Sequence, residues 1–243
     1  MKERGKYIME DTLYAKIKNY SNERYVEKLD EDYVFCPLNK NSLKDFNIKD
    51  GFMVFSKQEF DSENEKYKVK FKKDFYPMHR FYAKYELDKE FEKKLVFILF
   101  NPSTANPQAL DDTIKNCLIL ANNEKYSEVE VINLFSYRNS SVTTECRNNN
   151  QINKTFILEL LKHRTQNDIV LGWGVGKENP NHHLHNDIDD IIKKISEIDL
   201  EKKKVISINT DTITKYSHHP NPQVWRSLGP FEKIAILSDY TGA

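Results

Sequence analysis

The feature that most constrains the fold is an apolar run that ends in a polar turn. Leu95–Phe100 contains no polar residue, which is typical of a strand buried on both faces in a parallel sheet. Pro102 lacks the backbone N–H group that a central strand needs, so the chain turns there. Asp111 and Asp112 then offer capping side chains in front of Thr113–Asn122, whose apolar residues recur with helical spacing. In open α/β sheets, ligands bind at such a junction of strand, loop and helix.

Strands and helices alternate along the chain after this first strand. The pattern predicts further strands at 129–134, 168–173 and 205–208, and helices at 150–163 and 184–198. Strands separated by helices of this length run parallel and are joined by right-handed crossovers. We therefore predict an α/β fold with three layers, αβα, and a small parallel sheet of about four strands.

The first part of the chain has a different pattern. Residues 1–94 are polar, with short aromatic-rich runs such as Tyr67–Phe71, in which apolar residues alternate with lysine. This alternation is typical of half-exposed antiparallel strands. We therefore expect a β-rich extension at residues 1–94, packed on the core, and an α/β domain at residues 95–243.

Charge and cysteine content restrict the class of protein. Lys plus Arg and Asp plus Glu are equal at 37 each, so the chain has no overall attraction for nucleic acid or membranes, and any nucleic-acid surface is a local patch. The three cysteines are widely separated and form no CxxC pair, which is typical of a reduced cytoplasmic protein. No run approaches the roughly twenty apolar residues of a membrane span. We expect a cytoplasmic protein with no membrane partner, and a monomer rather than an oligomer.

Polar residues directly follow each predicted strand of the α/β part. Because the strands are expected to be parallel, these residues meet at one edge of the sheet. The sequence has neither a glycine-rich phosphate loop nor a G-x-S-x-G elbow. Amides that donate and accept hydrogen bonds suit a planar heterocycle such as a nucleobase, and an indole is close by to stack on it. The residues are Asn101, Pro102, Ser103, Thr104, Asn133, Arg138, Trp173, Gly174, His218, His219, Pro220 and Asn221.

Plain structural explanations remain open for most of these residues. Asn101 and Pro102 are also a common turn signal. Helix capping explains one of Asp111 and Asp112 without any function. Asn133 is harder to explain, because a buried amide in an apolar strand needs hydrogen-bond partners. In the plain explanation, Arg138 is a solvent-exposed side chain rather than a phosphate contact, and Trp173 is a core residue rather than a stacking platform. The histidines have no regular metal-ligand spacing with a cysteine or carboxylate, so no metal is expected.

Four motifs together resemble a known superfamily. FNPST, VINLFSYR, VLGWG and HHPNP, in this order and spacing, resemble the motif series of the uracil-DNA glycosylase superfamily. With the DDT that follows the first motif, they are still more similar to an uncharacterised bacterial and phage family marked by L-N-P-S-T-A-D, D-D-P-T, N-L-F and W-G. The resemblance covers about Leu95–Leu237. It implies a uracil-DNA glycosylase-like fold and an enzyme that hydrolyses an N-glycosidic bond in DNA, without metal or cofactor.

The resemblance also implies roles for individual residues. Asn101, together with Asp112, would hold the attacking water, and His219 would stabilise the negative charge that develops on the leaving base. Asn133 would read the polar edge of the base, which is flipped out of a duplex or taken from a single strand. The substrate-binding set would also include Pro102, Ser103, Thr104, Asp111, Trp173 and Gly174, and the residues in contact with DNA would be Arg138, Asn221 and Pro222.

Two departures from the superfamily pattern bear on the substrate. The uracil-specific branch has an acid at the position of Asn101, so water activation is weaker here or lies elsewhere. That branch also has a tyrosine at the position of Ser103, where it closes the pocket against 5-substituents. The serine predicts a preference for a 5-modified pyrimidine, such as a hydroxymethylated or glycosylated base. A substrate of this kind predicts a role in DNA repair or in defence against phage.

Two other functions fit the same residues. The first is a non-catalytic protein that binds a nucleobase or nucleotide, which agrees with the missing acid at position 101. The second is a hydrolase of free nucleosides or nucleotides. Zero net charge favours the second over work on DNA, because duplex binding depends on neutralising phosphates.

Overall fold

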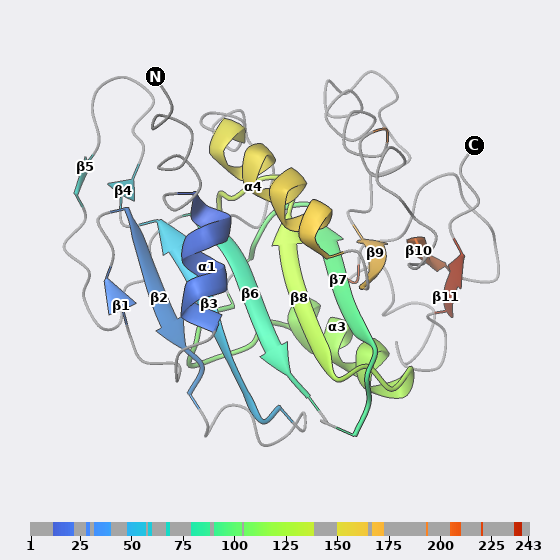
Figure 1. The fold of residues 1–243 in the computed structure, drawn as a ribbon. Helices are drawn as coiled ribbons and strands as arrows, with labels where there is room; N and C mark the ends of the chain where they lie inside the picture. Colours follow the sequence, from blue (N-terminus) through green and yellow to red (C-terminus); the bar gives the residue numbers. More distant parts are fainter. Residues whose placement is uncertain are drawn as a thin grey trace, which may run out of the picture.

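The computed structural model describes residues 12–21, 28–29, 32–39, 48–56, 58–59, 67–68, 79–87, 90–103, 105–138, 150–164, 167–172, 193, 205–209, 220 and 236–239. In this part the main feature is a nine-stranded mixed sheet with the order β1-β2-β3-β6-β8-β7-β9-β10-β11 (Figure 1). No helix in the described ranges is long and apolar enough to cross a membrane. The strands are β1 (Lys28–Leu29), β2 (Tyr33–Pro37), β3 (Asp50–Ser56), β6 (Arg80–Glu86), β7 (Lys94–Leu99), β8 (Glu128–Asn133), β9 (Asp168–Gly172), β10 (Val205–Asn209) and β11 (Ile236–Asp239), and the helices are α1 (Leu13–Ser21), α3 (Asp112–Asn123) and α4 (Asn150–His163). A separate hairpin pairs β4 (Gln58–Glu59) with β5 (Tyr67–Lys68).

The α/β class and the predicted parallel strands are confirmed. β7 pairs in parallel with both β8 and β9, and β9 pairs in parallel with β10. The register places Leu99 beside Asn133 on one side and beside Gly172 on the other, so the three strands end together. The predicted helix at 150–163 has these bounds in the structure, whereas the helix predicted at 184–198 lies outside the described residues apart from Lys193.

The predicted block of about four parallel strands is present as β8-β7-β9-β10, and antiparallel strands extend this block into a mixed sheet at both edges. β6 pairs antiparallel with β8, and β3, β2 and β1 continue the sheet beyond it. At the other edge, β11 pairs antiparallel with β10. The physical reason is that the outer strands of the block carry unpaired backbone groups, which the antiparallel strands satisfy. The N-terminal strands are antiparallel as expected, and the division at residues 94 and 95 stays a prediction.

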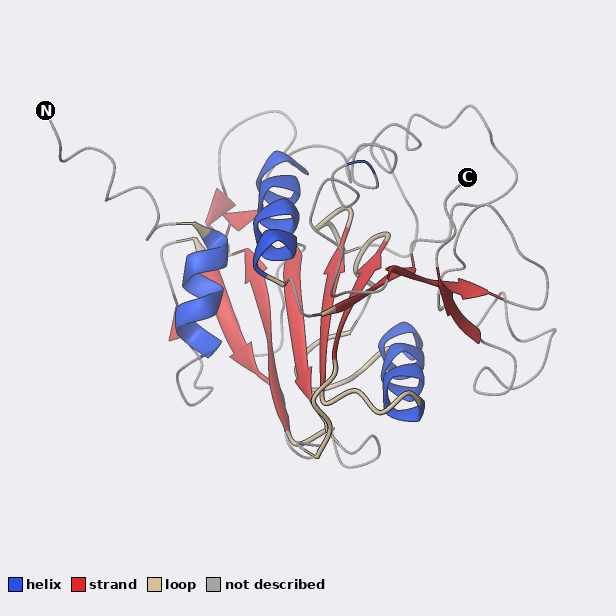
Figure 2. Cartoon of the chain, turned by 45° about the vertical axis from the view of Figure 1, so that its right-hand side comes forward, coloured by secondary structure: helices blue, strands red, loops and turns tan. Residues whose placement is uncertain are grey.

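Helices cover both faces of the sheet and give three layers (Figure 1, Figure 2). α1 and α4 pack on one face, here called the α4 face, and α3 packs on the other, the α3 face. The side chains of β7 alternate between them: Val96 and Ile98 join the core under α4, and Leu95, Phe97 and Leu99 join the core under α3. Every residue of Leu95–Phe100 is buried, which confirms the prediction of a strand buried on both faces.

Candidate functional site

The candidate site lies at the carboxyl-terminal ends of β7, β8 and β9. The chain leaves β7 through α3 on one face and reaches β8, and it then leaves β8 through α4 on the other face and reaches β9. Because β8 and β9 lie on opposite sides of β7, the second crossover runs across the sheet in the opposite direction to the first. In open α/β sheets, ligands bind outside the strand ends at such a reversal.

The loop after β7 begins beside the end of β8. The backbone pairing of the two strands continues past their ends, since Leu134 N donates to Leu99 O at 2.8 Å and Phe135 N donates to Phe100 O at 3.0 Å. In the loop that follows, Asn101 and Ser103 are partly exposed and Pro102 is buried. The structure therefore brings Asn101, Pro102 and Ser103 to the same edge as Asn133. Thr104 lies outside the described residues.

Asp111 ties this loop to the start of α3. One carboxylate oxygen accepts from Ile114 N at 2.9 Å, which makes Asp111 the N-cap of α3, and the other accepts from Ala105 N at 3.1 Å. Capping therefore accounts for one of the two predicted aspartates. Asp112 is exposed and lies 3.3 Å from Lys115 on the same helix. Its predicted part in holding water stays a prediction.

These two neighbouring aspartates provide a matched pair of variants. We expect Asp111→Ala to lower the free energy of unfolding by about 1–2 kcal/mol, because the helix loses its cap and the loop loses its anchor. Asp112→Ala removes the exposed ion pair with Lys115 and is expected to change the free energy of unfolding by less than about 0.5 kcal/mol. Urea denaturation of both variants measures the difference, and equal losses would contradict the capping role of Asp111.

Asn133 combines burial with an unpaired side chain. It is 1% exposed, and its register beside Leu99 places it on the α3 face. In the described part of the chain, neither its amide nitrogen nor its amide oxygen has a hydrogen-bond partner. Its backbone is held firmly, because Asn153 Nδ2 on α4 donates to Asn133 O at 2.8 Å and to Leu134 O at 2.9 Å. An unpaired amide donor and acceptor on a firmly held backbone suit a ligand with a mixed polar edge.

Two arginines reach the carbonyl groups of the loop after β7. Arg80 Nη1, from the start of β6, donates to Ala105 O at 2.9 Å. Arg138 Nε donates to Ser103 O at 3.3 Å and its Nη2 donates to Ala105 O at 3.5 Å, while its guanidinium lies 5.5 Å from the Phe55 ring centre. The sequence pointed to Arg138 but missed Arg80, although an arginine in the aromatic run His79–Tyr85 was a signal. The predicted DNA contact of Arg138 stays a prediction.

Further buried polar groups lie near Arg80 on the α3 face. Burial raises the pKa of the Tyr85 phenol, and the charge of Arg80 opposes this rise. Burial also raises the pKa of the Cys117 thiol, with a further contribution from Asp111. Both groups are therefore neutral near neutral pH. The hydroxyl of Tyr85 is buried and has no hydrogen-bond partner in the described part of the chain.

His79 fastens the segment after β8 to the start of β6. Its Nδ1 lies 2.9 Å from Ser136 Oγ, and the backbone N of Arg80 donates to Ser136 O at 2.9 Å. Burial lowers the pKa of His79 to about 4, so the imidazole is neutral near neutral pH. The sequence did not single out His79, because this histidine stands in the N-terminal segment, outside the motifs.

The fourth motif, HHPNP, comes close to α3 at one residue. Asn116 Nδ2 on α3 donates to Pro220 O at 3.1 Å, and both residues are buried. The middle of this motif therefore lies beside the helix that Asp111 caps. No group of three His, Cys, Asp or Glu side chains that fits a metal ion occurs among the described residues. The predicted site residues Trp173, Gly174, His219, Asn221 and Pro222 lie outside the described residues.

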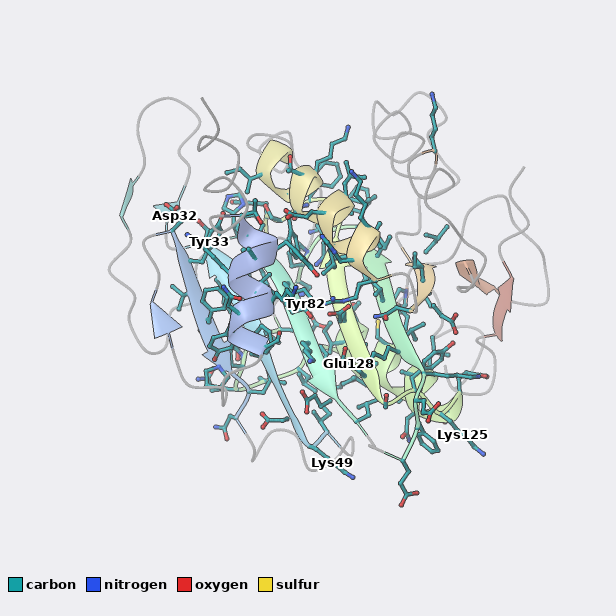
Figure 3. All side chains as sticks on the ribbon, in the orientation of Figure 1. Asp32, Tyr33, Lys49, Tyr82, Lys125 and Glu128 are labelled. Atoms are coloured by element: carbon teal, nitrogen blue, oxygen red, sulfur yellow. The ribbon has the colours of Figure 1, made fainter. Side chains whose placement is uncertain are left out.

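A second buried polar cluster lies on the α4 face, and the sequence patterns missed it. Glu130 on β8 is fully buried and accepts from Arg164 Nε at 2.8 Å and Nη2 at 2.7 Å. The hydroxyl of Tyr82 and Asn167 Nδ2 also donate to this carboxylate. Figure 3 shows Tyr82 beside α1 on this face. Burial lowers the pKa of Arg164, but the hydrogen bonds and charge of Glu130 outweigh this effect and raise it. With all its partners present, Glu130 serves to hold α4 on the sheet.

Comparison with known proteins gives one match. A family model described as a protein of unknown function, DUF1643, matches residues 80–221. This range begins at Arg80 and ends directly after Pro220, so it includes the two arginines, the loop after β7 and Asn133. Neither the curated proteins nor the solved structures gave a match.

Proposed function

The chain belongs to the DUF1643 family of proteins of unknown function, and we propose that it binds a nucleobase at the end of β8 and hydrolyses the N-glycosidic bond of that base in DNA. The observation that carries the proposal is the side chain of Asn133, which is buried and has no hydrogen-bond partner among the described residues. An unsatisfied buried amide costs about 1–3 kcal/mol, and a binding role accounts for its presence. A base with adjacent donor and acceptor groups satisfies both of its atoms.

The position of Asn133 limits how a base reaches it. At the carboxyl end of a buried strand, the amide is within reach of a nucleotide only if the base leaves its stack or comes from a single strand. Asn101 and Ser103 start the adjacent loop, where they would face the sugar and the 5-position of the base. The small side chain of Ser103, at the position where the uracil-specific branch has a tyrosine, supports a preference for a 5-modified pyrimidine over uracil.

The proposed reaction breaks the bond between the sugar C1′ and the base nitrogen, and both electrons of that bond leave with the base. A water oxygen, held by Asn101, forms the new bond to C1′ and releases a proton. The departing base carries negative charge until it takes up a proton. His219 is the residue that the superfamily resemblance assigns to this charge.

A non-catalytic base-binding protein is the second candidate. The observations that favour it are the amide in place of an acid at position 101 and the pairing of Asp112 with Lys115 on the helix surface. The two functions use the same site, and they differ only in whether water is activated.

Substitution of the two asparagines distinguishes these functions. The assay incubates the protein with oligonucleotides that carry uracil, thymine, 5-hydroxymethylcytosine or its glucosylated form, and alkali then cleaves any abasic site. We expect Asn133→Ala to abolish both binding and turnover. Asn101→Ala is expected to keep binding and to lower turnover by about 100-fold or more, because only the transition state depends on the held water.

The controls are thermal unfolding of each variant and binding measured at two salt concentrations. No abasic site on any oligonucleotide, with folded protein that still binds them, supports the binding protein. Fastest release of uracil would contradict the preference for a 5-modified base. Binding to free nucleosides together with DNA binding that hardly depends on salt would favour a hydrolase of small molecules.

A further inference from the structure

We propose that Arg80 is the anion-binding residue of this site, and that its guanidinium binds the base in its anionic form as the glycosidic bond breaks. This inference rests on the proposed function and names a residue for the charge that the reaction produces. Arg80 lies outside the four sequence motifs.

The first support is that Arg80 is a buried cation with no paired anion among the described residues. It is 2% exposed, and the one hydrogen bond that its side chain forms in the described part of the chain goes to the neutral carbonyl of Ala105. No described carboxylate forms an ion pair with it. A guanidinium has several N–H donors in a planar fork, and burying its charge is costly unless an anion offsets it.

The other buried cation of the same strand shows the contrast. Lys84 on β6 is 9% exposed, and its Nζ lies 2.9 Å from Glu128 and 3.4 Å from Glu86. Arg164, on the α4 face, likewise has Glu130. Where these buried or half-buried cations serve the fold, carboxylates from the chain accompany them. Arg80 therefore differs in kind from the structural cations of this protein.

The second support is the placement of Arg80 relative to Asn133. Arg80 pairs with Phe55 and contacts Ala105, and both of these residues belong to the core under α3. Asn133 stands on the same α3 face, and its strand, β8, is the neighbour of β6. Paired strands present their side chains side by side on a face. A base held by Asn133 therefore lies on the same face as the guanidinium.

Among the described titratable groups around Arg80, Asp111 is the acid, and its carboxylate forms no ion pair with the guanidinium. Tyr85 and Cys117 stay neutral, since burial raises their pKa values, and His79 stays neutral above a pKa of about 4. Asp111, the nearby acid, accepts from Ile114 N and Ala105 N. Arg138 also donates to Ala105 O. In the reaction, Arg80 keeps its proton and offsets the charge that the bond electrons carry to the base, which later takes up a proton from solvent.

The test compares binding of two free bases. 5-Nitrouracil loses a ring proton at mildly acidic pH because its nitro group withdraws electrons, whereas thymine stays neutral over the same range. We expect the wild-type protein to bind 5-nitrouracil about 10- to 100-fold more tightly above its ionisation than below it, and thymine equally at both pH values. Arg80→Gln, whose amide can still donate to Ala105 O, is expected to remove this difference. Isothermal titration calorimetry measures each dissociation constant.

Arg138→Gln is the matched control, because Arg138 also donates to Ala105 O and so shares any role in holding the loop. It is expected to keep the preference for the anion, as is Arg80→Lys, which keeps the charge. Equal binding of 5-nitrouracil by the wild type at both pH values overturns the role of Arg80 but not the proposed function. Equal loss of the preference for the anion in Arg80→Gln and Arg138→Gln has the same consequence. Failure of both bases to bind, without abasic sites in the oligonucleotide assay, overturns the proposed function as well.

Discussion

Replacement of Glu130 by alanine is expected to lower the free energy of unfolding by about 3–5 kcal/mol, the largest loss among the substitutions considered for this protein. The carboxylate is fully buried and accepts from Arg164, Tyr82 and Asn167. Without it, the Arg164 guanidinium is left half-buried without its anion, and the Tyr82 hydroxyl is left without its acceptor. Urea denaturation followed by circular dichroism measures the loss.

The double variant Glu130→Met with Arg164→Met is the control. It removes the buried pair as a unit and replaces it with apolar side chains, so we expect it to recover most of the stability that Glu130→Ala loses. A loss below about 1 kcal/mol for Glu130→Ala would show that the pair is solvated and does not hold α4. A double variant less stable than Glu130→Ala would show that the charges themselves stabilise the fold.

The parallel part of the fold was predictable because its signals are local. The apolar run Leu95–Phe100 needs two covered faces, and the strand–helix alternation after it leaves few arrangements. The helix at Asn150–His163 was predicted with the correct bounds for the same reason. What the local pattern cannot say is which edge a distant antiparallel strand will pair with. β6 joins β8 although β7 and α3 stand between them in the chain.

The buried polar residues also divide into those that a local sequence signal marks and those that only tertiary contacts reveal. Asn133 and Asn101 were found because a strand end marks them, and the strand ends of a parallel sheet meet. Glu130 stands in the middle of an apparently apolar strand, and its partners come from α4 and from β6. Arg80 begins a strand that the sequence assigns to a separate part. Which charges become partners depends on tertiary contacts, and periodicity contains no information about them.

Two buried asparagines near the end of β8 are expected to respond in opposite ways to the same substitution. Asn133→Leu is expected to raise the free energy of unfolding by about 1–2 kcal/mol, because an unpaired buried amide gives way to an apolar side chain of similar shape. Asn153→Leu is expected to lower it by about 2–3 kcal/mol, because Asn153 Nδ2 donates to both Asn133 O and Leu134 O. Thermal and urea unfolding of the two variants measure the signs.

Base binding provides the second half of this comparison. Asn133→Leu is expected to lose detectable binding of 5-nitrouracil while the protein becomes more stable, which is the behaviour of a residue kept for function at a cost in stability. Asn153→Leu, where it is folded, is expected to keep binding, since its side chain serves the backbone. If both variants lose stability to the same extent, the Asn133 amide is paired in solution and its role is structural. If the Asn133→Leu protein is more stable and still binds the base, the unpaired amide does not recognise the base. The main support for the proposed site would then be removed.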